Sequence, residues 1–197
     1  MRSLDIISAV AAAAVFCAAS SLAQAAGAPD LKLGTPVSAA DIAAIDIDIS
    51  TSDGVGLPPG KGTVADGAKI YAEKCVECHG EKAAGGSMYG SMVGGVGSFL
   101  TDKRKLTPGS MYPYAPILFD YIRRAMPMTA PQSLTNEEVY ALSAYILNLN
   151  GLVPDGGSLD AKTMAAIEMP NRNGFIVDDR PDAKAVRCMK DCPPIKD

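Results

Sequence analysis

The sequence predicts an all-α domain of three main helices, flanked by an irregular N-terminal arm and an irregular C-terminal tail. Apolar residues recur at helical spacing in three segments, residues 63–75, 115–125 and 135–149. Glycine, proline and other turn-forming residues dominate most of the remaining chain. The chain has 197 residues, which suits one domain with extensions better than two full domains.

Residues 1–25 have the order of a secretory signal peptide. Arg2 is followed by an apolar stretch from residue 6 to residue 19, and the segment closes with Ala23-Gln24-Ala25. The apolar stretch is shorter than the ~20 residues that a helix needs to cross a bilayer. We therefore expect export to the periplasm, cleavage of this segment and no stable membrane span. Cys17 would be removed with it.

Residues 26–62 are expected to form the N-terminal arm. Ile45, Ile47 and Ile49 alternate with aspartates, a pattern that favours a short strand or an edge segment. Glycines and prolines then mark a loop that runs to residue 62. The composition fits either an extended arm that packs on the domain or a flexible tail.

The predicted helices of the domain, residues 63–151, carry their own start and stop signals. Two of them begin with a threonine that is followed three residues later by an acidic residue: Thr63 with Asp66, and Thr135 with Glu138. Pro127 forbids continuation of the second helix, and Asn150-Gly151 ends the third. Residues 80–97 are rich in glycine and are expected to be a loop. The C-terminal extension, residues 152–197, has one weak helical stretch at residues 159–167.

The motif that carries the chemistry is Cys75-Val76-Glu77-Cys78-His79. Its C-x-x-C-H spacing is the attachment pattern of c-type haem. Two cysteines three residues apart at the end of a helix can reach two vinyl groups on one porphyrin edge, and the next histidine supplies the proximal iron ligand. The motif therefore predicts one covalently attached haem c, held by Cys75, Cys78 and His79.

Two other interpretations of the C-x-x-C pair are a redox disulfide and half of a zinc site. A thioredoxin-like protein needs strands that alternate with helices, whereas this region has a helix followed by a glycine loop. A zinc site needs two more ligands nearby, whereas Cys188 and Cys192 are more than 100 residues further along the chain.

The sixth ligand of the iron is expected to be a methionine, because the chain has one histidine. Met126 is the first choice, since Pro127 ends the second helix there and stiffens the turn. Met128 is the alternative close by, and Met169 is a more distant one. For three other methionines we expect packing in the core instead: Met88, Met92 and Met164.

Cys188 and Cys192 are expected to form a disulfide, because the compartment oxidises thiols and the mature chain has an even number of cysteines. The other interpretation of these two cysteines is a regulatory or partner-linked thiol pair. Pro193 follows where haem attachment would need a histidine, so a second haem is not expected. Arg123 and Arg124 precede Met126, and they would face a haem propionate, an acidic partner or only solvent.

The formal net charge is −4 at pH 7 and the isoelectric point is about 5.0. Nucleic-acid binding needs a basic face, so it is not expected. An acidic haem protein would instead meet redox partner proteins through patches of complementary charge.

The chain resembles class I cytochromes c over residues 63–151. The matching features are the Gly67-x-x-x-Tyr71 helix before the C-x-x-C-H motif, the Met126-Pro127 turn and the final helix with Tyr145. The resemblance implies a class I cytochrome c fold, with three main helices around one haem. It also implies that the first and last helices cross at Gly67, Tyr71 and Tyr145. Residues 80–100 lack the family's proline, whose carbonyl accepts the second N–H of the ligand histidine.

A narrower resemblance, to SoxD-type cytochrome subunits of molybdenum sulfite or sulfane dehydrogenases, covers nearly the whole mature chain. The matching stretches are residues 56–64, 112–115, 118–127, 130–135, 144–151 and 169–172. The resemblance implies an electron-transfer protein, not an enzyme by itself. It would carry electrons from a SoxC-like molybdenum dehydrogenase of sulfur oxidation to a downstream cytochrome or oxidase. The alternatives are a haem enzyme with an open or labile sixth site, peroxidase-like or thiosulfate-acting, and a subunit of another periplasmic dehydrogenase.

Overall fold

The structure is a computed structural model that describes residues 34–179. The chain divides into two units, Met1–Asp46 and Ile47–Asp197. The leader, Cys17, Cys188 and Cys192 lie outside the described residues, so the predicted signal peptide and disulfide stay predictions.

In the first unit, the described part contains one helix, α2 (Ala39–Ile45). Ser38 and Asp41 form a capping box at its start, and four of its seven residues are alanine, which favours a helix. The strand predicted from Ile45, Ile47 and Ile49 is wrong. Ile45 is the last residue of α2, and residues 46–50 belong to no strand, since alternation needs a neighbouring strand to pair with.

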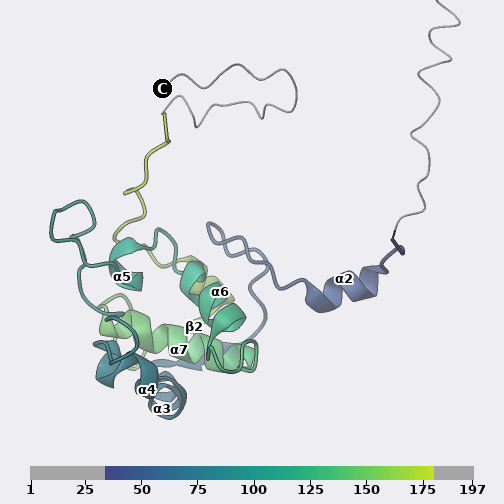
Figure 1. Cartoon of the computed structure of the whole chain (residues 1–197), viewed down its shortest axis with the longest axis horizontal. Helices are drawn as coiled ribbons and strands as arrows, with labels where there is room; N and C mark the ends of the chain where they lie inside the picture. The colour runs from purple at the N-terminus through teal and green to yellow at the C-terminus, as the bar shows by residue number, and fades with distance from the viewer. Residues whose placement is uncertain (1–33, 180–197) are drawn as a thin grey trace, which may run out of the picture. The chain divides into compact units, whose positions relative to one another are not determined.

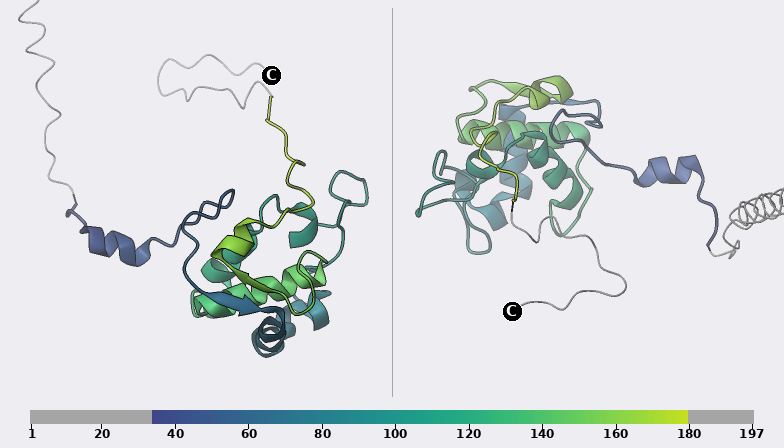
Figure 2. Two further views of the ribbon diagram at one scale, coloured as in Figure 1. Left: turned by 180° about the vertical axis from the view of Figure 1, so that it is seen from behind. Right: turned by 90° about the horizontal axis from the view of Figure 1, so that it is seen from above.

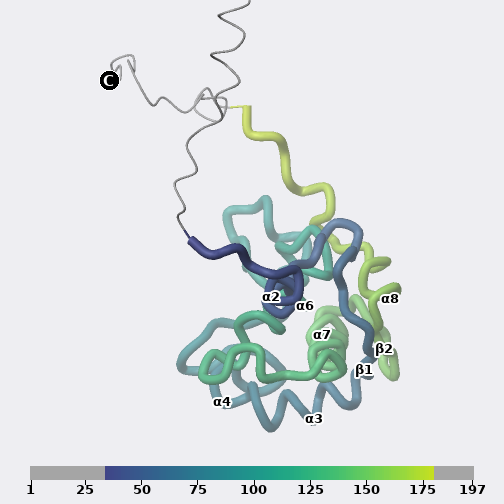
Figure 3. Tube along the Cα trace, turned by 90° about the vertical axis from the view of Figure 1, so that its right-hand side faces the viewer, coloured from purple at the N-terminus to yellow at the C-terminus, as the bar shows by residue number. Residues whose placement is uncertain are grey.

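The second unit contains the three predicted helices, α3 (Val64–Lys74), α6 (Pro116–Ala125) and α7 (Asn136–Leu149). α7 contacts both α3 and α6, and it lies between them when the unit is viewed from the side (Figure 3). Thr135 and Glu138 form the predicted capping box of α7. Thr63 caps α3 as expected, but Asp66 pairs with the Thr63 hydroxyl group, not with the backbone that completes the box.

The crossing of α3 and α7 occurs at the residues that the resemblance to class I cytochromes c implies. Gly67 lies directly against Ala141 and Tyr145, so a Cβ atom at residue 67 would overlap the carbonyl group of Ala141. The rings of Tyr71 and Tyr145 meet beside this point, with their centroids 5.3 Å apart. The absence of a side chain at Gly67 therefore allows close contact between the two helices.

Four short helical segments connect the main helices or follow them. They are α4 (Val76–His79), the 3-10 turn η1 (Glu81–Ala83), α5 (Pro108–Met111) and α8 (Ala161–Ala165). Figure 1 shows α4 next to the end of α3, and α5 at the far end of the long loop that follows η1. None of the helices in residues 34–179 has the length and apolar character that a bilayer crossing requires.

A two-stranded sheet joins the C-terminal extension to the start of α3. Strand β1 (Lys61–Thr63) pairs antiparallel with β2 (Ser158–Asp160), with Lys61 opposite Asp160. Figure 2 shows the two strands side by side from behind. Further along, Met164 and Met169 are buried, and Asn171 Nδ2 donates a hydrogen bond of 2.8 Å to the Met111 carbonyl group. Residues 152–171 thus contribute directly to the core.

Candidate haem-binding site

The C-x-x-C-H residues line a cavity of roughly 330 Å³ in the second unit. The end of α3, α4, the loop around residues 88–92, the turn after α6 and one face of α7 enclose it. Eight of the eighteen residues that line the cavity have aliphatic or thioether side chains: Met88, Met92, Ile122, Met126, Met128, Leu134, Leu142 and Ile146. A second cavity of roughly 430 Å³, between residues 97–100 and 168–174, contains neither histidine nor cysteine.

Cys75 lies at the boundary between α3 and α4, and Cys78 lies within α4. Cys75 is the C-cap of α3 and the N-cap of α4, and its non-helical φ of −127° lets the chain change direction there. Cys75 and Cys78 are partly buried free thiols. Burial is the main factor that raises the pKa of Cys75 to about 11, so its thiol is neutral at pH 7.

His79 has one buried ring nitrogen. Nδ1 is shielded from solvent and has no hydrogen-bond partner within the described part of the chain. Burial lowers the pKa of His79, which keeps the imidazole neutral, the form that binds iron. Within residues 34–179, no other group replaces the proline carbonyl group that residues 80–100 lack. The ring of Tyr89 stacks on the imidazole, with centroids 5.2 Å apart and planes 27° apart.

The backbone around His79 is fixed by hydrogen bonds. The Tyr71 hydroxyl group donates to the Gly80 carbonyl group over 2.8 Å, and the Gly85 N–H donates to the His79 carbonyl group over 3.0 Å. Gly80 has a φ of +74°, and a Cβ atom there would overlap Gly85. The histidine is therefore presented from a rigid turn that depends on glycine.

Met126 and Met128 line the same cavity as His79. Met126 is the C-cap of α6, and its N–H donates to the Ile122 carbonyl group over 3.0 Å. Its side chain is partly buried and packs against the core. Met128 is 58% exposed, and its sulfur accepts a hydrogen bond of 3.4 Å from the Tyr89 hydroxyl group.

The other methionines divide into two groups. Met164 is fully buried, as predicted, and Met169 is buried at the second cavity, away from the cysteines. Met88 is 58% exposed, so the prediction that it packs in the core is wrong. It lies in the glycine-rich loop, which has few apolar neighbours to cover it, and it lines the cavity together with Met92. Met92 also packs against the core.

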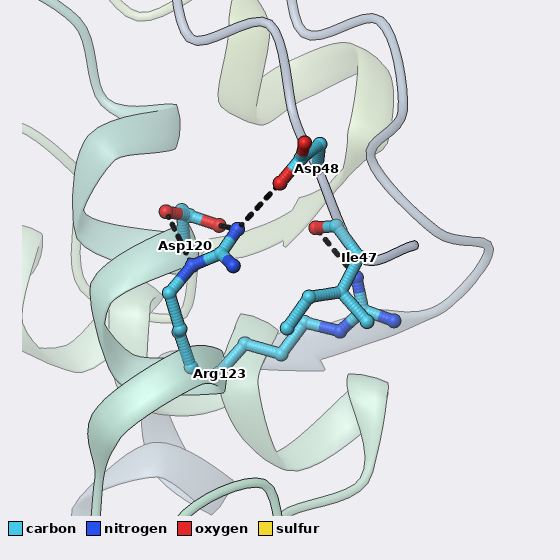
Figure 4. A network of polar contacts seen from close by, with 5 residues as sticks. Ile47, Asp48, Asp120 and Arg123 are labelled. Atoms are coloured by element: carbon cyan, nitrogen blue, oxygen red, sulfur yellow. Dashed lines mark hydrogen bonds and ion pairs between the residues drawn. The ribbon is translucent and has the colours of Figure 1, made fainter. Parts of the chain in front are cut away.

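The basic pair Arg123 and Arg124 does not line this cavity. Arg124 forms ion pairs with Asp120 over 2.8 Å and with Asp48 over 3.2 Å, and Arg123 contacts the Ile47 carbonyl group over 3.5 Å (Figure 4). The pair therefore joins α6 to residues 47–48. The prediction of a propionate contact is not supported, because the arginines lie among these other partners.

The sequence analysis did not identify Tyr89 as a residue of the site. It lies in a segment of small residues whose composition predicts only a loop. The one available signal was a lone aromatic residue ten positions after His79, between two methionines of the same loop.

The cavity fits a haem by the chemistry of its walls. It combines two partly buried free thiols, a neutral imidazole with a buried Nδ1, thioether sulfurs and a mostly apolar lining. Within residues 34–179, no group of three or more histidine, cysteine or acidic side chains could hold a bare metal ion.

Comparisons with known proteins agree with this chemistry. Residues 62–146 match the family described as cytochrome C oxidase, cbb3-type, subunit III. A chain in the crystal structure of the sulfane dehydrogenase SoxCD from Paracoccus pantotrophus is 35% identical, with a TM-score of 0.71. The match covers 85% of each chain. No curated protein sequence matches the chain.

Proposed function

This chain belongs to the c-type cytochrome family as a SoxD-like member, and from this premise we propose that it carries single electrons between redox proteins of the periplasm. The observation that supports the proposal most strongly is the convergence of Cys75, Cys78, His79 and Met126 on one mostly apolar cavity. These four residues are the attachment points and the two axial ligands that a class I cytochrome c needs.

The chain's own residues would hold the haem in three ways. Cys75 and Cys78 would bind it covalently, and His79 would bind its iron on one side while Met126 binds on the other. When bound, the haem supplies one-electron exchange between ferric and ferrous iron. Met/His ligation raises the reduction potential, and the apolar lining from Ile122, Leu142 and Ile146 further limits access of water to the site.

The proposed donor is a SoxC-like molybdenum sulfite or sulfane dehydrogenase. The support is the similarity to a chain of the sulfane dehydrogenase SoxCD over 85% of both chains. The proposed acceptor is a downstream cytochrome or oxidase. With one C-x-x-C-H motif in the chain, the protein would relay electrons through a single haem c.

The proposal is tested on the holoprotein produced with its leader in a bacterium that matures c-type cytochromes. We expect one haem that stays with the denatured chain, a one-electron reductive titration, and no binding of carbon monoxide by the reduced protein, because both axial positions are filled. Rapid carbon monoxide binding would contradict the carrier proposal and favour an enzyme with an open sixth site.

The donor is tested by affinity purification of the tagged cytochrome from its native cells. We expect a molybdenum-containing subunit to co-purify, and the haem to become reduced when sulfite or thiosulfate is added. A Cys75→Ser/Cys78→Ser variant, which would not retain haem, is the control for the reduction signal. Co-purification with a dehydrogenase that lacks molybdenum would overturn the donor assignment while leaving the carrier function intact.

A further inference from the structure

Helix α2 has an apolar sequence, yet none of its residues is buried. Ile42 and Ile45 are 52% and 78% exposed, and Val37, just before the helix, is 63% exposed. We propose that α2 is a docking helix for the SoxC-like molybdenum dehydrogenase, where it would bind in an apolar groove that has a basic rim. This inference rests on the donor in the proposed function.

The two isoleucines of α2 lie on one face of the helix. Ile42 and Ile45 are three residues apart, which is close to one helical turn, whereas Ala40 and Ala44 occupy the opposite face. Exposed apolar side chains that are gathered on one element mark a contact with another protein. Apolar anchors at this spacing are typical of a helix that binds in a groove.

Helix α2 is also too short to be stable by itself. It has seven residues, whereas isolated helices shorter than ~12–15 residues are marginal in water. Its start is nevertheless well defined, since Ser38 Oγ donates to Asp41 Oδ2 over 2.6 Å and accepts from the Asp41 N–H over 3.1 Å. The sequence therefore specifies where the helix begins, and a partner would supply the stabilisation that its length does not.

The charge of the segment around α2 narrows the class of partner. Residues 34–60 contain four aspartates and no lysine or arginine. A second copy of the chain is disfavoured, because its net charge of −4 has the same sign. The negative surface of an anionic membrane would repel the segment for the same reason. A protein groove rimmed by lysine or arginine complements both the isoleucines and the aspartates.

The residues directly after α2 are attached to the rest of the second unit. Asp48 forms an ion pair with Arg124 over 3.2 Å (Figure 4), and Ile49 packs against the core. Because α2 ends at Ile45, only a few residues separate it from this attachment. A partner that binds α2 would therefore stay at a high effective concentration near the cytochrome domain.

A lasting complex with the donor fits this contact better than a brief encounter with the acceptor. The cavity of the C-x-x-C-H motif is lined by residues between Tyr71 and Ile146, so α2 is not part of its lining. The surface around the cavity would stay available for electron transfer while α2 is bound. The similarity to the SoxCD chain covers 85% of this chain, a larger share than residues 47–179 represent, so it continues outside them.

The test measures the binding of the full-length holoprotein to the molybdenum subunit that co-purifies with it. Ile42→Gln/Ile45→Gln should raise the dissociation constant at least about tenfold, because it makes both anchors polar while glutamine retains a high helix propensity. Ala40→Gln/Ala44→Gln is the matched control. It places the same side chains on the opposite face and should change the dissociation constant less than about twofold.

Two further measurements on the same proteins complete the binding test. The wild-type dissociation constant should rise with salt concentration, because salt screens complementary charges. The far-red sulfur-to-iron charge-transfer band of the oxidised holoprotein, which reports a methionine ligand, should be the same in the wild type and both variants. An unchanged band shows that weaker binding does not come from a damaged haem site.

Hydrogen exchange of the α2 amides provides a second readout. In the wild type, a peptide that covers residues 38–46 should exchange at least about tenfold more slowly in the complex than in the cytochrome alone, because docking would stabilise the helix. The same peptide of Ile42→Gln/Ile45→Gln should show little slowing.

Three outcomes would overturn the inference and leave the donor assignment intact. If Ile42→Gln/Ile45→Gln binds like the wild type, or if residues 38–46 exchange equally fast in the complex, α2 is not the docking helix. If both variants weaken binding equally, the isoleucine face does not carry the contact. If the cytochrome alone forms a dimer that only the isoleucine variant dissociates, α2 binds a second copy instead. Failure of the wild type to bind any molybdenum subunit would overturn the donor assignment together with the inference.

Discussion

Lys74 Nζ lies 2.6 Å from Glu138 Oε1, which joins the last residue of α3 to the first turn of α7. The same carboxylate also accepts a hydrogen bond of 2.9 Å from the Thr135 N–H through its other oxygen, Oε2. Because Cys75 follows Lys74 directly, this one side chain links the start of α7 to the segment that carries the C-x-x-C-H motif.

Replacing Glu138 with glutamine is expected to destabilise the fold by about 1 kcal/mol at pH 7, since it removes the charge from a cap and from a partly buried ion pair. For a chain of this size, that corresponds to a fall of about 2–4 °C in the thermal midpoint. The thermal midpoint is measured by thermal unfolding followed by circular dichroism. Glu137→Gln is the control, because Glu137 is the exposed neighbour in the same turn and should change the midpoint little.

The effect of Glu138→Gln should depend on pH. The hydrogen bond from Lys74, followed by the backbone bond of Thr135, lowers the pKa of Glu138 from 4.5. A carboxyl group whose pKa is lower in the folded protein stabilises it above the unfolded pKa, and this stabilisation is lost as the pH falls through the folded pKa. The wild type should therefore exceed the variant in free energy of unfolding by the full amount at pH 6–7. This difference should shrink below about pH 4.5. A difference that grows in acid would contradict this linkage.

Gly67→Ala should destabilise the fold by about 1–3 kcal/mol, because the added methyl group would overlap the Ala141 carbonyl group at the crossing of α3 and α7. Denaturant unfolding measures the change in the free energy of unfolding. Gly90→Ala adds the same methyl group where no atom lies within 4 Å of it, so it should be close to neutral. Equal effects of the two substitutions would show that the helix crossing is looser than the structure indicates.

Asn150→Ala should cost about 1–3 kcal/mol of stability, because it removes three hydrogen bonds at the end of α7. Asn150 Nδ2 donates to the carbonyl groups of Ile146 and Met92, over 2.8 Å and 3.1 Å, and Oδ1 accepts from the Gly94 N–H over 3.1 Å. Met92 lines the cavity, so we also expect a shifted reduction potential in protein film voltammetry. Asn173→Ala, at an exposed asparagine, should change neither quantity.

Arg124→Met should loosen residues 47–50 without changing the haem ligands. It removes the ion pairs with Asp48 and Asp120, which are solvent-exposed and together contribute less than about 1 kcal/mol. The amide of Ser50, which donates to the Val55 carbonyl group over 2.8 Å, should exchange its hydrogen several-fold faster, as measured by mass spectrometry. A changed far-red band would contradict the placement of Arg124 outside the cavity. Arg104→Met, on the exposed loop before α5, is the control.

The sequence predicted the three main helices because each has a local signal that tertiary structure did not override. Thr135 with Glu138 caps α7, Pro127 follows the end of α6, and Thr63 caps α3. The C-x-x-C-H residues could be assigned for the same reason, since the spacing by itself encodes the chemistry.

Other features depend on contacts between distant parts of the chain, and the sequence did not predict them. Strands β1 and β2 have only three residues each, and their pairing joins Lys61 to Asp160 across the whole domain. The contact between Tyr89 and Met128 spans 39 residues. The alternating isoleucines suggested a strand, but the capping box of Ser38 and Asp41 starts a helix that includes the first of them, Ile45.

The central claim, that His79 and Met126 are the axial ligands of one c-type haem, is tested most directly by the far-red absorption spectrum of the oxidised holoprotein. The account predicts a sulfur-to-iron charge-transfer band in the wild type, its loss in Met126→Ala, and its retention in a Met111→Ala variant. Absence of the band from the wild type, with haem covalently attached, would contradict methionine ligation.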